Sequence, residues 1–99
     1  MKKLDEIIDI LQSAKPELVE RFGLTAMEIF GSYSRNEQNE NSDVDILIDF
    51  SDEKYPSLIA FIGIQHDLED KLGIRVDLIS KNGIKPRYRK YILNETILI

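Results

Sequence analysis

The sequence predicts a small mixed α/β (α+β) fold in which a three-stranded mixed sheet carries helices packed on one face. Helical and strand-like hydrophobic periods follow one another in the order helix, helix, strand, strand, helix, strand, helix. Two of the strand-like runs, 42–48 and 75–79, also carry aspartates, which we expect on the open side of the sheet. With 99 residues, the chain is expected to form one domain, 1–99, with a single core.

Two helices are expected before the first strand. Residues 3–13 have a helical spacing of apolar side chains, at Leu4, Ile7, Ile8 and Leu11. Pro16 fits the first turn of a second, short helix, and Gly23 is a natural terminator for it. Residues 25–30 then form the first strand, and the polar run 36–41 is too hydrophilic to be buried, which predicts a surface connection.

The second strand carries two aspartates on one face. Because strand side chains alternate, Asp43 and Asp45 point the same way with attachment points about 6.6 Å apart. The alternate positions face the core: Val44, Ile46, Ile48 and Phe50. Two carboxylates this close repel by roughly 3 kcal/mol at an effective dielectric near 20, so folding alone gives no reason for them. A divalent cation would remove the repulsion, and oxygen-only ligation suits Mg²⁺ or Mn²⁺ rather than Zn²⁺.

The second half of the chain predicts a helix, a strand and a last helix. Residues 57–72 form the clearest helix, with Ser57 able to cap its start and Gly73 its end. Its apolar stripe comprises Leu58, Phe61, Ile62, Ile64, Leu68 and Leu72. The third strand, 74–80, leads through a turn at 81–83 into a helix from about Pro86 to Ile97.

Composition excludes several classes of protein. Hydrophobic residues make up 42% and charged residues 31%, and no apolar run approaches the ~20 residues that cross a membrane. Acidic residues interrupt the N-terminal segment where the apolar core of a signal peptide would lie, so a cytoplasmic location is expected. The lack of cysteine excludes disulfides and thiolate metal sites.

The charge of the chain is unevenly distributed. The net charge of −5 argues against general nucleic-acid binding, which depends on neutralising phosphates. Residues 1–80 hold 8 basic and 17 acidic side chains, whereas residues 81–99 hold 5 basic and 1 acidic. The basic residues of this tail are Lys81, Lys85, Arg87, Arg89 and Lys90. They would contact nucleotide phosphates, RNA or an acidic partner, or simply form a solvated face.

A glycine–serine pair precedes the aspartate strand. Gly31 lies where the first strand meets a turn, and its lack of a side chain would let a phosphate approach the backbone, to which Ser32 could donate. Ten residues later the Ser-Asp-x-Asp run begins, and a third acid, Asp77, follows on a later strand. This arrangement resembles the minimal nucleotidyltransferase family, whose signature is Gly-Ser, Asp-x-Asp and a distant Asp. The resemblance implies the DNA polymerase beta-like nucleotidyltransferase fold over essentially the whole chain.

The resemblance also implies an activity and a set of site residues. It implies transfer of AMP from ATP to a hydroxyl, with Asp43, Asp45 and Asp77 as catalytic residues and ligands of two Mg²⁺ ions, or Mn²⁺ in their place. Asp77 would also help to take the proton of the hydroxyl. Gly31, Ser32 and Arg35 would bind the nucleotide. Family members often have a basic residue directly after Gly-Ser, whereas this chain has Tyr33 there.

The acceptor of the AMP group is implied only by family and size. Small members of this family pair with HEPN ribonuclease toxins and transfer AMP to a toxin tyrosine, which implies an antitoxin that forms a hetero-oligomer with its toxin. Two alternatives stay open. One is a non-catalytic antitoxin that neutralises its toxin by binding, and the other is a nucleotidyltransferase subunit that acts on a small molecule.

Four other side chains were weighed as functional residues. Asp49 lies about 13 Å along the strand from Asp45, so we expect it to be solvated rather than a ligand. His66, the only histidine, is expected to be a surface imidazole because it lacks the paired ligands of a zinc site. Tyr88 and Tyr91 would either stack on adenine or pack in the core or an interface.

Overall fold

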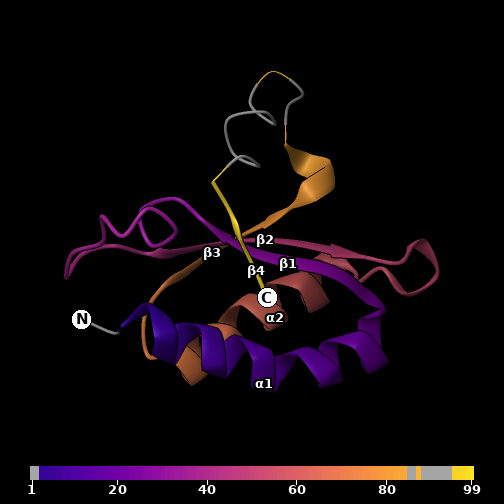
Figure 1. The fold of residues 1–99 in the computed structure, drawn as a ribbon. Helices are drawn as coiled ribbons and strands as arrows, with labels where there is room; N and C mark the ends of the chain where they lie inside the picture. Colours follow the sequence, from indigo (N-terminus) through magenta and orange to yellow (C-terminus); the bar gives the residue numbers. More distant parts are fainter. Residues whose placement is uncertain (1–2, 85–86, 88–94) are drawn as a thin grey trace.

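Within the residues that it describes, the structure places two long helices beneath one four-stranded sheet (Figure 1). It is a computed structural model that describes residues 3–84, 87 and 95–99. The elements in chain order are α1 (Leu4–Phe22), β1 (Leu24–Phe30), β2 (Val44–Phe50), the 3₁₀ turn η1 (Asp52–Lys54), α2 (Leu58–Leu72), β3 (Val76–Ser80), the 3₁₀ turn η2 (Lys81–Gly83) and β4 (Ile97–Leu98). The predicted mixed α/β fold with its helices on one face is therefore confirmed, but the sheet has four strands and not the predicted three.

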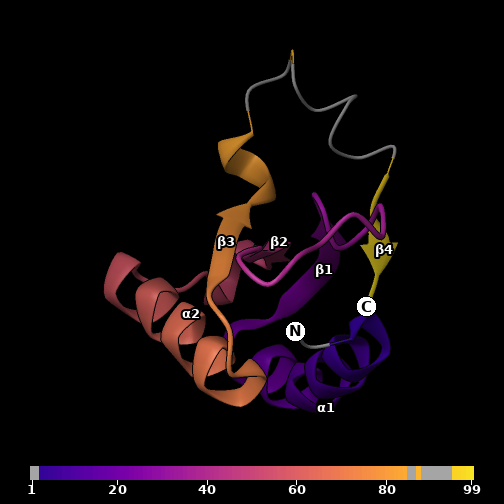
Figure 2. The same ribbon diagram turned by 90° about the vertical axis from the view of Figure 1, so that its left-hand side faces the viewer.

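The sheet has the strand order β3-β2-β1-β4. Strand β1 runs antiparallel to both β2 and β4, whereas β2 and β3 are parallel and are connected through α2. Figure 2 shows α1 and α2 side by side on one side of the sheet, with η2 rising from the other side. The face of the sheet that does not carry α1 and α2 is the one on which the aspartates lie.

The two helices predicted before the first strand are a single helix, α1, with Pro16 inside it. Proline in a helix interior costs about 3 kcal/mol, because it offers no N–H to the carbonyl four residues earlier, here that of Gln12. Gln12 and Pro16 are both exposed, so water can reach that carbonyl. The buried residues of α1 keep one stripe across the proline: Ile7, Leu11, Ala14 and Leu18. Burial of this stripe offsets the lost hydrogen bond, and the prediction of a break at Pro16 was wrong.

The three predicted strands are confirmed with small shifts of their ends. Strand β1 begins one residue before the predicted 25–30, and β3 begins at Val76 rather than at residue 74. In β2 the four residues predicted to face the core, Val44, Ile46, Ile48 and Phe50, all belong to the buried cluster. Asp45 and Asp49 alternate with them and are only partly buried. Leu47, on the side of the aspartates, is also buried.

Helix α2 forms within the predicted range, and its predicted caps are confirmed. The Ser57 hydroxyl accepts a hydrogen bond from the Ala60 N–H at 3.1 Å, and Gly73 ends the helix in the left-handed conformation at φ 71°. Part of the predicted apolar stripe is not core, however, since Leu58 and Ile62 are 75% and 45% exposed. His66 is exposed, as expected. Neither described helix has the length and apolarity that crossing a membrane requires.

The end of the chain differs from the prediction. Ile97 and Leu98 form the edge strand β4 instead of ending a helix, and they pair with Ile29 and Glu28 of β1. The Ile99 N–H also donates to the Met27 carbonyl at 2.9 Å. Backbone pairing with an otherwise open sheet edge satisfies these groups, and β-branched isoleucine favours it. Of the rest of the predicted last helix, Arg87 is described and is helical, whereas residues 86 and 88–94, with Tyr88, Arg89, Lys90 and Tyr91, lie outside the described residues, as does Lys85.

Candidate active site

The parallel pairing of β2 and β3 places two of the predicted site residues side by side. Asp45 is the register partner of Asp77, and paired residues of neighbouring strands project from the same face of a sheet. Asp43 precedes β2 by one residue and comes close enough to raise the pKa of Asp45. The three predicted carboxylates therefore converge, although they come from two strands that 25 residues of α2 and its connections separate.

The surroundings of Asp45, the central acid of the site, raise its pKa. The pKa of Asp45 is raised from 3.8 to about 6, first of all by partial burial and then by the nearby carboxylates of Asp77 and Asp43. A hydrogen bond between the Asp45 and Asp77 carboxyl groups acts in the same direction, so Asp45 takes up a proton at a higher pH than an ordinary aspartate does. Asp77 itself is exposed. The fold thus tolerates three neighbouring carboxylates at one place on the sheet.

Gly31 packs directly against the carboxylate of Asp45. Its φ of 73° lies in the left-handed region, and a Cβ added to it would meet Asp45 Oδ2 at 2.1 Å and Asp45 Cγ at 3.0 Å. Both the backbone conformation and the lack of space therefore require glycine. The sequence analysis predicted an open backbone at Gly31 for a phosphate, and the structure adds that this backbone lies against the central acid of the site.

A tight turn follows Gly31 and presents Ser32 beside the acids. The Gly31 carbonyl accepts hydrogen bonds from the Ser34 hydroxyl at 2.8 Å and from the Arg35 N–H at 3.3 Å, and the Glu37 N–H donates to the Ser32 carbonyl at 2.9 Å. Within the described part of the chain the Ser32 hydroxyl has no hydrogen-bond partner, which leaves it available to a ligand.

The residue after the Gly-Ser pair anchors this turn. Tyr33 is 1% exposed and belongs to the hydrophobic core, and its burial raises the pKa of its hydroxyl. The family often has a basic residue at this position, whereas here the side chain is directed into the core. Tyr33 is therefore a structural residue, and Arg35 is the first cation after the pair.

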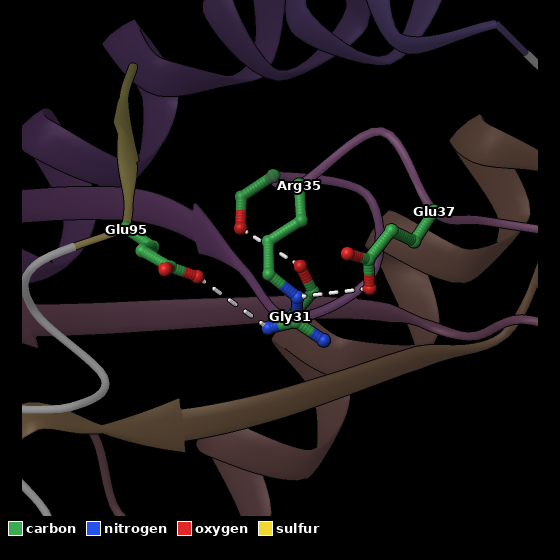
Figure 3. A network of polar contacts seen from close by, with 5 residues as sticks. Gly31, Arg35, Glu37 and Glu95 are labelled. Carbon is green, nitrogen blue, oxygen red and sulfur yellow. Dashed lines mark hydrogen bonds and ion pairs between the residues drawn. The ribbon is translucent and has the colours of Figure 1, made fainter.

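Arg35 lies in a network of carboxylates at the edge of the site (Figure 3). Its Nε lies 3.2 Å from a carboxylate oxygen of Glu37, and its Nη1 lies 3.9 Å from one of Glu95. The guanidinium is close enough to lower the pKa of Asp45, against the effect of the other acids. The predicted nucleotide-binding residues Gly31, Ser32 and Arg35 thus share one turn next to the acids.

Two ion pairs on this side of the molecule were not predicted from the sequence. Arg75 Nε lies 3.1 Å from Asp43 Oδ1, and Lys81 Nζ lies 2.6 Å from a carboxylate oxygen of Glu28. Glu28 is only 6% exposed and also accepts a hydrogen bond from the Thr96 hydroxyl at 3.2 Å. Lys81, predicted as part of a basic tail, is therefore engaged with a buried acid. The register that follows from pairing Val44 with Val76 would have indicated the first pair, but register is not readable from one strand alone.

Comparison with known proteins identifies the family. Residues 5–99 match the family model described as "Nucleotidyltransferase domain". The chain belongs to this family. It is 48% identical over 99 residues to protein adenylyltransferase MntA of Thermococcus cleftensis, and the match covers 100% of this chain and 98% of the relative.

Solved structures agree with this family. The fold matches the structure of a minimal nucleotidyltransferase with a TM-score of 0.80 and 34% identity, over 99% of this chain and 97% of the other. It also matches a chain of a toxin–antitoxin complex with AMP-PNP, with a TM-score of 0.70 and 25% identity, over 98% of this chain and 72% of the other. The protein is thus a nucleotidyltransferase.

The donor set of this nucleotidyltransferase fits a hard divalent cation. Carboxylate oxygens are the ligands that Mg²⁺ and Mn²⁺ prefer. The pKa of Asp45 is raised first by burial and then by the carboxylates of Asp77 and Asp43, and a bound cation would stabilise its ionised form. Among residues 3–84, 87 and 95–99, no three acidic or histidine side chains form a ready-made metal cage. Asp43 is paired with Arg75, and Asp45 with Asp77, so these side chains would have to change partners to hold an ion.

The raised pKa of Asp45 predicts how stability depends on pH. The folded chain holds the proton of Asp45 more tightly than the unfolded chain, so this residue's contribution to the free energy of unfolding falls as pH rises from about 4 to 6. We expect the metal-free wild type to lose roughly 1 kcal/mol over this window relative to Asp45→Asn, after allowance for solvent screening. Thermal unfolding in EDTA across pH 4–7 measures this difference. A wild type that gains stability relative to Asp45→Asn over that window would contradict it.

Proposed function

We propose that this nucleotidyltransferase transfers AMP from ATP to a tyrosine hydroxyl of a partner HEPN-type toxin and thereby acts as an antitoxin. The observation that carries the proposal is the pairing of Asp45 with Asp77 beneath Gly31, next to the Gly31–Ser32 turn. The 48% identity to a protein adenylyltransferase supports a protein as the acceptor, and the toxin–antitoxin complex with AMP-PNP supports both the partner and ATP.

Each site residue has a role in this proposal. Asp43, Asp45 and Asp77 would hold Mg²⁺, as two ions, with Mn²⁺ as an alternative. When bound, Mg²⁺ supplies positive charge that stabilises the phosphates during transfer and departure. The Gly31 backbone and the Ser32 hydroxyl would hold the triphosphate in register, with Arg35 providing positive charge at its edge. These are positioning roles.

The reaction follows in-line transfer. The acceptor oxygen forms a bond to the α-phosphorus of ATP while the bond from that phosphorus to the bridging oxygen breaks, and pyrophosphate leaves with the bonding electrons. The proton of the acceptor hydroxyl goes to a carboxylate, for which Asp77 is our choice, because its side chain is exposed where an acceptor hydroxyl can reach it.

The open site favours an acceptor that another protein carries. Asp77 is exposed at the surface of the sheet, so a side chain presented by a partner can reach it. A groove of about 330 Å³ lies elsewhere, between α1 and α2, where Leu18, Ile64 and Leu68 line it. That groove is on the side of the sheet away from the acids and does not serve as an acceptor pocket for a small molecule there.

One observation favours the second candidate function, an antitoxin that inhibits by binding alone. The first turns of α2 expose Leu58, Ile59 and Ile62 by 75%, 84% and 45%, and exposed apolar clusters mark protein interfaces. Such an interface is also compatible with an enzyme that binds its substrate. The two functions therefore differ in whether the partner is modified.

Mass spectrometry of the partner separates the two functions. The protein is incubated with a HEPN-type toxin encoded beside it, ATP and Mg²⁺, and the intact toxin is then weighed. We expect mass increments of AMP on a tyrosine, absent with Asp43→Asn and absent when EDTA replaces Mg²⁺. An unmodified toxin that is nevertheless fully inhibited would establish the binding antitoxin instead.

A further inference from the structure

The pairing of β2 with β3 also sets Arg75 beside Asp43. The Val44 N–H donates to the Arg75 carbonyl at 2.9 Å, which continues the ladder of the two strands by one residue. The register of Val44 with Val76 then brings the preceding residues, Asp43 and Arg75, next to each other. The distance of 3.1 Å from Arg75 Nε to Asp43 Oδ1 is that of a charge-assisted hydrogen bond. The backbone, rather than chance contact of two long side chains, therefore positions this pair.

The guanidinium of Arg75 forms one ion pair, and most of the side chain is exposed. The Arg75 side chain is 78% exposed and the Asp43 side chain 43%. Within the described residues, Asp43 is the partner of Arg75, and its other nitrogens face solvent. An ion pair this exposed is weak, typically below 1 kcal/mol, so a ligand can break it readily.

Arg75 and Arg35 form ion pairs with different carboxylates. Arg35 already lies between two carboxylates, those of Glu37 and Glu95, whereas Arg75 neutralises one of the three site acids directly. Arg75 is thus the cation that occupies Asp43 in the metal-free chain.

We propose that Arg75 is the counter-ion that Asp43 exchanges for the divalent cation, and that it keeps the metal affinity of the free site low. This inference rests on the proposed function, since it requires Asp43 to be a metal ligand. Before exchange, the guanidinium satisfies Asp43. During exchange, Asp43 loses that partner and the positive charge of Arg75 opposes the incoming cation. As a consequence, the site binds the cation when the triphosphate provides additional oxygen ligands. The cation therefore binds together with the nucleotide.

Binding of Mn²⁺ alone, without nucleotide, tests this proposal. Free Mn²⁺ is titrated by electron paramagnetic resonance against wild type, Arg75→Gln and Arg75→Lys. We expect Arg75→Gln to bind Mn²⁺ about two- to fivefold more tightly than wild type, the range that an exposed ion pair allows, and Arg75→Lys to stay close to wild type. Arg21→Gln is the matched control, because Arg21 forms a similarly exposed pair with Glu17 at 3.3 Å on α1, away from the acids, and should leave Mn²⁺ binding unchanged.

The outcomes separate this inference from the proposed function. Equal or weaker Mn²⁺ binding by Arg75→Gln, with clear binding by wild type, overturns the role of Arg75 and leaves the metal site in place. A wild type that binds no Mn²⁺ in the presence of ATP overturns the proposed metal site itself.

A second measurement tests the ion pair without any metal. Asp43→Asn removes both the attraction to Arg75 and the repulsion from Asp45. In the Arg75→Gln background only the repulsion remains to be removed. The change in melting temperature caused by Asp43→Asn in EDTA should therefore be about 1–6 °C more positive in that background than in wild type. Identical changes in the two backgrounds would show that the pair does not form and would overturn the proposal.

Discussion

We expect Asp45→Asn to reduce AMP transfer by at least roughly a thousandfold while the folded chain remains intact. A metal-liganding carboxylate contributes several kcal/mol of charge stabilisation in the transition state, and each 1.36 kcal/mol corresponds to a factor of ten in rate. Asparagine has nearly the same shape as aspartate, and its amide can donate to Asp77 without a bound proton. The measurement is the rate of appearance of AMP-modified partner at saturating ATP and Mg²⁺.

The stability of the same variant serves as its control. Above pH 6, Asp45 is forced to ionise next to Asp43 and Asp77, so its replacement should raise the melting temperature of the metal-free protein. Greater stability combined with lost activity is typical of a residue retained for function. Transfer within tenfold of wild type would instead exclude Asp45 from the metal-binding set, whatever the effect on stability.

Gly31→Ala should remove transfer by a different route. A methyl group at this position would lie 2.1 Å from Asp45 Oδ2, so the carboxylate must leave its place, and a displacement of about 1 Å from the reacting geometry costs roughly a hundredfold in rate. The left-handed φ of 73° adds about 1–2 kcal/mol of backbone strain. We expect at least a hundredfold loss of transfer and a lower free energy of unfolding, measured by urea denaturation.

Gly73→Ala separates strain from displacement of the acid. Gly73 has nearly the same φ, 71°, but a Cβ there would meet nothing within 4 Å. This variant should lose a similar 1–2 kcal/mol of stability and still transfer AMP at the wild-type rate below its melting temperature. Equal losses of transfer in the two variants would mean that reduced stability, and not the contact with Asp45, explains the effect of Gly31→Ala.

Local signals in the sequence predicted most of the elements, because those signals act within one element. Alternation along β2 assigned its core side and its acid side, and the caps Ser57 and Gly73 set the ends of α2. The rule that proline begins a helix failed at Pro16, where the local penalty of about 3 kcal/mol is smaller than the gain from burying one continuous stripe. Local preference predicts an element well until packing with the rest of the chain outweighs it.

The tertiary structure decided the contacts between elements. The sequence by itself determined the mixed α/β class, the common face of Asp43 and Asp45, and the family to which the Gly31–Ser32 and aspartate pattern belongs. The fourth strand, the contact of Gly31 with Asp45 and the pairing of Arg75 with Asp43 depend on which strands are neighbours and in what register. Register and strand order are properties of residues far apart in the chain, so no local pattern contains them. Register and strand order are therefore defined only in the folded sheet.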